Sequence, residues 1–299
     1  MNTIRIPGKV MLSGEYAVLH GGAAAMMPVS RFLTLTESAD ADEDSSPVVR
    51  LARDWPIERL PSGPAPGSFV VDRSEFLHAA TGHKTTKLGL GSSAAEAVAV
   101  IAWRYQRAGL SWQDFRAEIA TIADAVHRQA QGGHGSGADV ALCAHGQPLL
   151  FHRADDAPVV AFVDSQLPLT QPLHLVWTGA GANTRVMMEI FERWRDGTGT
   201  QVKAKLDSLV TASRRLAGDW FGGDADQLLE HVDRHQAIME TISEGAGLPY
   251  FTQEHRKLAA WARGHGGRCK PTGAGGGDMA LLIGDLPIAE LDGLVLGVG

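Results

Sequence analysis

The chain has 299 residues, which is long enough for two modest domains that share an interface. Its 34 acidic residues outnumber its 27 basic residues, and the net charge of −7 argues against nucleic acid or an anionic membrane as a partner. The two cysteines, Cys143 and Cys269, form no metal-spaced pair, and neither a signal segment nor a membrane-spanning apolar run is found, so we expect a cytoplasmic protein.

The order of the expected elements predicts the fold class. In the first half, the hydrophobic pattern predicts strands at 4–12 and 32–37, a solvated hairpin tip at 38–46, a strand at 48–51, and helices at 92–108 and 112–131. In the second half, it predicts strands at 149–151, 159–163 and 173–177, helices at 183–194, 201–217, 225–243 and 253–265, and a strand at 279–283. Strands followed by helices and a late strand indicate an α+β protein. The domain boundary is expected near Gln166, which gives domains at 1–166 and 167–299.

A glycine-rich turn runs directly into the helix expected at 92–108. The segment 87–95 reads Lys-Leu-Gly-Leu-Gly-Ser-Ser-Ala-Ala. Glycines let the backbone approach a phosphate closely, and the free N–H groups and the dipole of a helix N-terminus favour an anion. One of the hydroxyls of Ser92 and Ser93 is expected to cap the helix, and the other to reach Mg²⁺ or a phosphate. Lys87, just before the turn, is a candidate for contacting the β- or γ-phosphate, with an ordinary exposed lysine as the alternative.

Other readings of this turn fit less well. A dinucleotide-binding fingerprint needs a buried strand before its first glycine, whereas residues 81–87 are polar and basic. A Walker-type loop needs Gly-Lys followed by Ser or Thr, but Gly8-Lys9 is followed by Val10. A plain helix start with small residues stays open as an alternative.

Two further segments point to a reaction site. Asp139 lies in a glycine-rich turn that is expected to enter an apolar strand, and a partly buried acid there needs a nearby cation to stay ionised. The glycine run at 273–277 joins the basic segment at 268–270 to the late strand, and we expect its backbone to close over the acceptor and the γ-phosphate. Asp278 is expected to be a turn residue.

His231 and His235 have the spacing of a metal pair but no suitable third ligand, so we interpret them as structural.

The segments 7–16, 87–95 and 270–278 resemble, in the family's order, the three signature motifs of the GHMP kinase superfamily. This resemblance covers residues 4–284. It implies a two-domain α+β fold with an N-terminal half like the second domain of ribosomal protein S5 and a C-terminal ferredoxin-like α/β half. It also implies a kinase that uses ATP and Mg²⁺ and transfers a phosphoryl group to a small-molecule acceptor, as a monomer or a homodimer.

The resemblance also assigns roles to residues. Lys9 and Asp139 are the implied catalytic pair. The implied nucleotide-binding residues are Lys87, Gly89, Leu90, Gly91, Ser92, Ser93 and Ala94, with Ser93 as the metal ligand. The implied substrate-binding residues are Glu15, Ser136, Gly137, Arg185, Lys270, Gly275 and Gly276. For Glu15 the alternative is that it fixes the turn, and for Arg185 that it is a surface helix residue.

Within the superfamily, the segments 127–132 and 135–141 resemble the phosphomevalonate kinases. Mevalonate kinases carry a metal-binding glutamate eleven residues before the catalytic aspartate, and here that position is Arg128. Phosphomevalonate is therefore the favoured acceptor. A mevalonate kinase, another small-molecule kinase of the superfamily, a diphosphomevalonate decarboxylase and a catalytically silent binding protein remain alternatives.

Overall fold

The computed structural model describes residues 3–39, 44, 46–61, 67–79, 85–154, 157–164, 166–197 and 199–298. Helices and antiparallel sheets are both present, as expected for an α+β protein. The chain forms two compact units built from interleaved segments. The first unit contains Met1–Lys9, Pro28–Thr85 and Leu90–Gln147, and the second contains Val10–Met27, Thr86–Gly89 and Pro148–Gly299. The boundary between contiguous domains near Gln166 stays a prediction.

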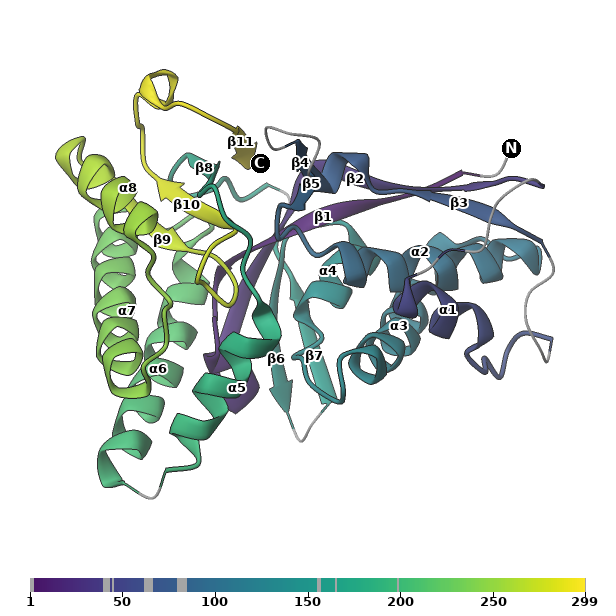
Figure 1. Cartoon of the computed structure of the whole chain (residues 1–299), viewed down its shortest axis with the longest axis horizontal. Coiled ribbons are helices and arrows are strands. Elements are labelled where there is room, and N and C mark those ends of the chain that lie inside the picture. Colours follow the sequence, from purple (N-terminus) through teal and green to yellow (C-terminus); the bar gives the residue numbers. More distant parts are fainter. Residues whose placement is uncertain are drawn as a thin grey trace. The chain divides into compact units, whose positions relative to one another are not determined.

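The helices of the first unit pack against one another around α2 (Figure 1). They are α1 (Pro47–Asp54), α2 (Ser92–Arg107), α3 (Arg116–Ala130) and α4 (Ala138–His145), with short 3-10 helices at Ser74–Phe76 and Trp112–Phe115. Every residue of α2 from Ala94 to Tyr105 is buried, and its many alanines allow the other helices to approach closely. The helix predicted at 92–108 is confirmed, and the one predicted at 112–131 begins as a 3-10 turn.

The strand predicted at 48–51 is wrong, because these residues lie in helix α1. Pro47 occupies the start of the helix, where its missing N–H costs nothing. The buried residues Val48, Val49 and Ala52 follow helical spacing and face the same side. Two adjacent valines favour a strand by propensity alone, but packing against α2 and α3 decides the outcome here.

One antiparallel sheet has the order β1-β2-β6-β7, with β3 also pairing with β2. Its strands are β1 (Thr3–Ser13), β2 (Ala23–Glu37), β3 (Phe69–Asp72), β6 (Leu149–Ala154) and β7 (Ala157–Phe162). The strands β4 (Leu77–Ala79) and β5 (Thr85–Lys87) form a separate pair. The strands predicted at 4–12, 32–37, 149–151 and 159–163 are confirmed, although β2 begins nine residues earlier than predicted. Most of the hairpin tip predicted at 38–46 lies outside the described residues.

The second unit contains an antiparallel sheet of order β11-β8-β10-β9. Its strands are β8 (Leu173–Trp177), β9 (Arg268–Pro271), β10 (Met279–Ile283) and β11 (Val295–Val298). Its helices are α5 (Thr184–Arg195), α6 (Thr200–Asp219), α7 (Ala225–Ala246) and α8 (Gln253–Gly264), with 3-10 helices at Ala17–His20 and Ile288–Glu290. All four predicted helices are confirmed. No helix within the described residues has both the length and the apolar character needed to cross a bilayer.

Candidate active site

Helix α2 begins without a side-chain cap. Gly91 is its N-cap residue in the left-handed conformation, with φ of 83°. No side chain accepts a hydrogen bond from the first turn, so the expected capping by Ser92 or Ser93 is wrong. The backbone N–H groups of the first turn therefore have no partner within the helix and point toward an open end with positive dipole character. This arrangement suits the phosphates of a nucleotide.

The glycine turn packs directly against the first motif. The backbone N–H of Lys9 donates to the carbonyl of Leu90 at 3.0 Å. A Cβ atom at Gly91 would lie only 2.8 Å from Lys9 Cγ, so this position needs glycine both for its φ and for the space. As a result, the Lys9 side chain is held across the start of α2.

Lys9 and Asp139 form the ion pair that the resemblance implies. Lys9 Nζ lies 3.3 Å from Asp139 Oδ2. The Lys9 side chain is 11% exposed and the Asp139 side chain 33% exposed, so the pair is largely shielded yet still reachable by a ligand. The cation that the sequence predicts beside Asp139 is therefore present.

Asp139 lies in the first turn of helix α4, and the strand predicted to follow this turn is wrong. Gly137 is the N-cap residue, with φ of 88°, and the backbone N–H of Ala138 donates to Ser136 Oγ at 3.2 Å. The apolar run after Asp139 favours a strand or a buried helix equally, since α4 is covered on nearly all sides. Asp139 therefore lies at the positive end of the α4 helix dipole.

An ion pair on α3 supports the turn before Asp139. Arg128 Nε lies 3.1 Å from Asp124 Oδ2, and Arg128 Nη2 donates to the carbonyl of Ser136 at 3.4 Å. A Cβ atom at Gly137 would lie 2.7 Å from Asp124 Oδ1. The Asp124–Arg128 pair thus packs against Ser136 and Gly137 and fixes the direction of α4. Sequence reasoning missed Asp124, whose one signal was its spacing of four residues from Arg128.

His127 is a second residue that the sequence did not assign. Its Nε2 lies 3.0 Å from Ser93 Oγ and 2.8 Å from the Gln131 amide nitrogen. Burial lowers the pKa of His127, although Asp139 and Asp124 act in the opposite direction. With the Gln131 amide in this orientation its nitrogen donates, so the neutral ring accepts at Nε2. The single lone pair of Nε2 is thus shared between the Gln131 amide and the Ser93 hydroxyl, and this contact keeps Ser93 Oγ close to His127.

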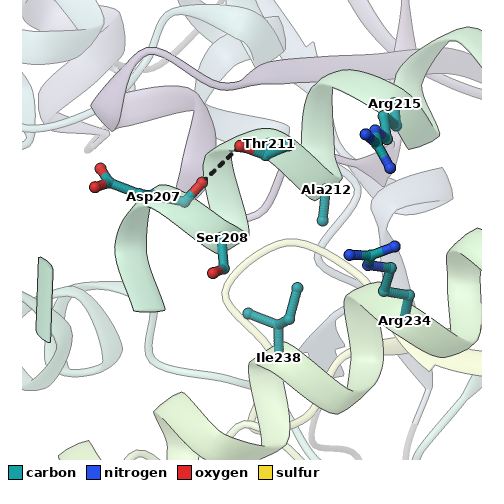
Figure 2. Close-up of a pocket in the computed structure, with 7 residues that line it drawn as sticks. All are labelled: Asp207, Ser208, Thr211, Ala212, Arg215, Arg234 and Ile238. Carbon is teal, nitrogen blue, oxygen red and sulfur yellow. Dashed lines mark hydrogen bonds between the residues drawn. The ribbon is translucent and has the colours of Figure 1, made fainter. Parts of the chain in front are cut away.

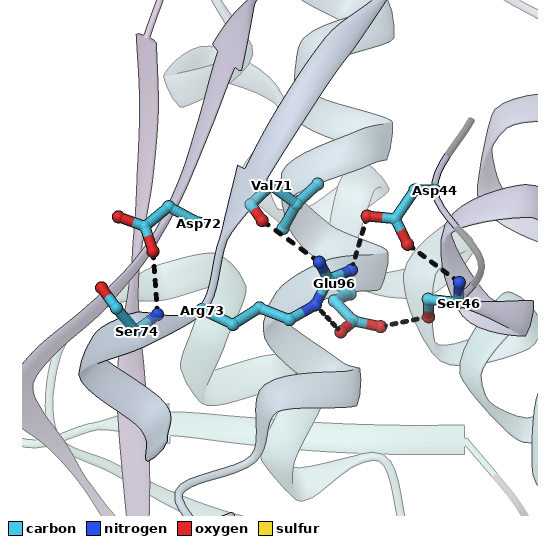
Figure 3. Close-up of polar contacts among 7 residues, drawn as sticks. All are labelled: Asp44, Ser46, Val71, Asp72, Arg73, Ser74 and Glu96. Atoms are coloured by element: carbon cyan, nitrogen blue, oxygen red, sulfur yellow. Dashed lines mark hydrogen bonds and ion pairs between the residues drawn. The ribbon is translucent and has the colours of Figure 1, made fainter. Parts of the chain in front are cut away.

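A buried polar network anchors the far side of α2 (Figure 3). Arg73 Nε donates to Glu96 Oε1 at 2.6 Å, and Ser46 Oγ donates to Glu96 Oε2 at 2.6 Å. Arg73 also donates to Asp44 Oδ2 at 2.8 Å and to the carbonyl of Val71 at 3.1 Å. Glu96 is 4% exposed, so its charge is matched inside the protein, and α2 is fixed in place three residues beyond Ser93.

In the second unit, Glu15 and Lys270 form a buried ion pair. Each residue is 1% exposed, and Lys270 Nζ also donates to the carbonyl of Pro271 at 2.8 Å. Burial and the charge of Lys270 lower the pKa of His235 to about 3 and that of His255 to about 4. The pair links the first motif to β9, which favours the turn-fixing alternative for Glu15.

The glycine run of the third motif is packed against aromatic side chains of the second unit. Tyr16 stacks on Phe191 at 4.4 Å between ring centroids, and its hydroxyl donates to the carbonyl of Ala274 at 2.6 Å. The backbone N–H of Gly276 donates to the carbonyl of Tyr250 at 2.9 Å, and a Cβ atom at Gly275 would overlap the Tyr250 ring. Glycine is thus required for this close contact. That the backbone of the glycine run closes over an acceptor stays a prediction.

Asp278 holds a turn, as expected from the sequence. It has φ of 56°, and its Oδ1 accepts a hydrogen bond from the backbone N–H of Ala182 at 3.0 Å. A Cβ atom at Gly89 would lie 2.6 Å from Asp278 Cγ, so the first glycine of the phosphate turn packs on this carboxylate. The loop before α5 is positioned by the same contact.

The remaining predicted residues lie at the surface. Lys87 is exposed at the end of β5. Arg185 has a side chain that is 78% exposed and lies 3.8 Å from Glu189 on the same helix, as in the surface alternative. Neither is brought close to another predicted site residue of its own unit by a hydrogen bond or ion pair within the described ranges, and their roles stay predictions. His231 contacts Asp219, with 2.6 Å between Nδ1 and Oδ2.

Comparison with known families supports the resemblance. Residues 79–147 match the family model described as the GHMP kinases N terminal domain. This stretch contains the phosphate turn, α2, α3 and α4, and therefore Ser93, His127 and Asp139. The chain thus carries a GHMP kinase N-terminal domain.

Similar proteins extend over nearly the whole chain. A phosphomevalonate kinase from Streptomyces sp. strain CL190 is 28% identical over 93% of this chain and 88% of its own length. One from Saccharolobus solfataricus is 24% identical over 95% of this chain and 91% of its own.

Solved structures share the fold. The Streptococcus pneumoniae phosphomevalonate kinase in complex with phosphomevalonate and AMPPNP has a TM-score of 0.74 and 19% identity, covering 95% of this chain and 92% of that one. The L. major mevalonate kinase in complex with R-mevalonate has a TM-score of 0.70 and 17% identity, covering 100% and 95%. The GHMP kinase fold is confirmed, and both kinds of mevalonate-pathway kinase share it.

Proposed function

Since the chain carries the GHMP kinase N-terminal domain on the GHMP kinase fold, we propose that it is an ATP-dependent kinase that converts phosphomevalonate to diphosphomevalonate. The observation that carries this proposal is the Lys9–Asp139 ion pair, with 3.3 Å between Nζ and Oδ2. The open N-terminus of α2 belongs to the same compact unit and is held against Lys9 by the Leu90 carbonyl. A silent binding protein has no need of this arrangement.

In the reaction, an oxygen of the acceptor's phosphate attacks the γ-phosphorus of ATP and forms a new P–O bond. The bond from that phosphorus to the bridging oxygen of ADP breaks, and ADP keeps the electron pair. Positioning and charge neutralisation dominate the catalysis of such a transfer. The N–H groups at the start of α2 bind the phosphates, and Lys9 neutralises the charge on the group in transfer.

The chemistry of the acceptor decides what Asp139 does. A phosphate monoester has a second pKa of about 6, so its oxygen is already ionised near neutral pH. Asp139 then orients the acceptor together with Lys9. An alcohol acceptor such as mevalonate keeps its proton near neutral pH, and Asp139 would have to remove it as a general base.

The residues near α2 fit a magnesium ion that is held mainly by ATP. Mg²⁺ keeps several waters and takes only one or two protein oxygens besides the substrate phosphates. Ser93 Oγ would supply one such oxygen, and it lies 3.0 Å from His127 Nε2. When bound, Mg²⁺ neutralises phosphate charge. Within the described residues, three or more acidic, histidine or cysteine side chains never gather into a metal cluster, so we propose no all-protein metal site.

Two kinds of support favour phosphomevalonate over mevalonate as acceptor. Both curated relatives that match the chain are phosphomevalonate kinases. Arg128, which replaces the metal-binding glutamate of mevalonate kinases, contacts the turn that positions Asp139. We also propose that Ser136 and Gly137 in this turn, together with Gly275, Gly276 and Arg185, bind the substrate, with the nucleotide-binding set as predicted above. Glu15 and Lys270, which are buried against each other, would position the substrate only through the segments that they hold.

The test measures ADP release from Mg-ATP against mevalonate, phosphomevalonate, diphosphomevalonate, galactose and homoserine. We expect turnover with phosphomevalonate. Asp139→Asn should lower turnover by about 100-fold or more while ATP affinity, measured separately with AMPPNP, stays unchanged. The matched control is Asp114→Asn, an exposed acid in the same unit. Turnover with mevalonate instead would establish the alternative acceptor, and full activity of Asp139→Asn would overturn the catalytic assignment.

A further inference from the structure

A pocket of about 380 Å³ lies between helices α6 and α7 of the second unit (Figure 2). Its volume falls in the range of about 300–1,000 Å³ that is typical of small-molecule sites. None of its lining residues belongs to the three motifs. The most informative of them are Arg215 on α6 and Arg234 on α7, whose guanidinium groups point toward each other in Figure 2.

Among the described residues, these two arginines have no counter-ion. Within the part of the second unit that the structure describes, most other arginines have a hydrogen-bond or ion-pair partner. For example, Arg214 donates to the carbonyl of Gly21 at 2.6 Å, and Arg263 lies 2.6 Å from Asp233. No carboxylate of the described residues lies within 4.0 Å of the Arg215 or Arg234 guanidinium. Both side chains are exposed, so water and salt screen their mutual repulsion, and a bound anion would relieve what remains of it.

The other pocket residues define the shape of the ligand. The hydroxyls of Ser208 and Thr211 donate to carbonyls of their own helix at 2.8 Å and 2.9 Å, so the arginines are the donors left for a ligand. Asp207 is neutralised by Lys203, with 2.7 Å between Nζ and Oδ2. Ala212 and Ile238 provide an apolar surface beside the charged end.

We propose that Arg215 and Arg234 form a binding site for a small phosphorylated metabolite. The planar forks of the two arginines would clamp a phosphate or diphosphate group through paired hydrogen bonds. A short hydrocarbon part of the ligand would lie on Ala212 and Ile238. This site is independent of the proposed kinase activity, because it uses no residue of the catalytic or nucleotide-binding set.

The test is calorimetric binding of inorganic pyrophosphate to the full chain at constant ionic strength. The wild type should bind pyrophosphate at this site in addition to any binding at the nucleotide site. Each of Arg215→Gln and Arg234→Gln should weaken the pocket's binding about tenfold or more, and the double variant should abolish it. Arg215→Lys should give an intermediate loss, since it keeps the charge but not the fork. Turnover with saturating substrates should stay at the wild-type level.

The matched control removes two positive charges elsewhere in the same unit. Arg193→Gln with Lys257→Gln changes the net charge equally on exposed helix surfaces. We expect this control to bind pyrophosphate like the wild type. If the control bound pyrophosphate as weakly as the double pocket variant, the binding would arise from general electrostatic attraction. If the double pocket variant bound pyrophosphate like the wild type, the nucleotide site would account for all of the binding. Either result overturns the proposal. Citrate in place of pyrophosphate should bind more weakly, and preferential citrate binding would reject the phosphate class.

Discussion

The central residues of the proposed site act as pairs. Lys9 meets Asp139, His127 meets Ser93, and each pair lies at the N-terminus of a helix or beside one. A charge or a hydroxyl held in this way keeps one geometry without needing the ligand to order it. Pairing therefore explains why so few side chains suffice for phosphoryl transfer on this fold.

The buried Glu15–Lys270 pair leads to a stability prediction. Lys270→Met leaves the Glu15 charge buried without its cation, and the free energy of unfolding should fall by about 3–5 kcal/mol. Glu15→Gln should lower the free energy of unfolding by a similar amount, because it leaves the Lys270 ammonium buried without a counter-ion. The double variant should lose less than the sum of the two single variants, since no uncompensated charge remains. Urea unfolding of the four proteins measures these differences.

The control for this prediction is an exposed pair in the same unit. Lys257 lies 3.1 Å from Glu254, with side chains 63% and 41% exposed. Lys257→Met should change the free energy of unfolding by about 0–1 kcal/mol, as surface ion pairs do. If the double variant lost as much free energy of unfolding as the two single variants together, Glu15 and Lys270 would contribute independently. The predicted coupling within the buried pair would then be wrong.

At the scale of elements, the sequence predicts the long helices well and the short elements poorly. The helices α5 to α8 each run for twelve residues or more and show clear helical spacing and end signals. The eight-residue helices α1 and α4 contain valines and apolar runs, so a local pattern cannot separate a buried helix from a strand. The short strands β9 and β11 are defined by their partners in the sheet, which the local sequence does not reveal.

The predictability of the site follows the same division. Motif residues such as Lys9, Gly91 and Asp139 are recognisable because their chemistry is tied to a fixed local pattern. The sequence did not identify Asp124 or Glu96, because each acts through a partner that the fold brings close. Asp124 pairs with Arg128, and Glu96 pairs with Arg73. Sequence patterns thus reveal the residues that we propose to contact the ligand more readily than those that support them.

The start of helix α4 provides a prediction about an element. Gly137→Ala places a Cβ atom at a φ of 88° and 2.7 Å from Asp124 Oδ1. The strained conformation costs about 1–2 kcal/mol, and displacing Asp124 adds to it. Turnover should also fall, because Asp139 lies two residues further on. Urea unfolding and ADP release measure the two effects.

A substitution at a second glycine separates the effect of backbone strain from the effect of the contact with Asp124. Gly133 has φ of 92°, and a Cβ atom there would meet no atom within 4 Å. Gly133→Ala should therefore show the backbone strain alone and leave turnover unchanged. If both variants lost the same stability and activity, the contact between Gly137 and Asp124 would have no measurable role.

For the whole molecule, buried histidines contribute to the response to acid. Burial lowers the pKa of six histidines among the described residues, namely His20, His127, His145, His174, His235 and His255. In the unfolded chain these rings bind a proton below a pH of about 6.5, whereas in the folded protein they stay neutral until the pH is lower. The unfolded state therefore binds more protons as the pH falls, and the free energy of unfolding must fall with it.

The sharpest test uses His235, whose pKa is lowered to about 3 and whose ring nitrogens have no hydrogen-bond partner within the described residues. Between pH 6 and 4 this group alone should lower the free energy of unfolding by up to about 1.4 kcal/mol per pH unit. Urea unfolding of His235→Asn across that window should show a shallower pH dependence, because asparagine takes up no proton. His134→Gln, at an exposed histidine, serves as the control and should leave the slope unchanged. An unaltered slope in His235→Asn would mean that His235 binds its proton equally in both states, and that the acid response arises from the carboxylates instead.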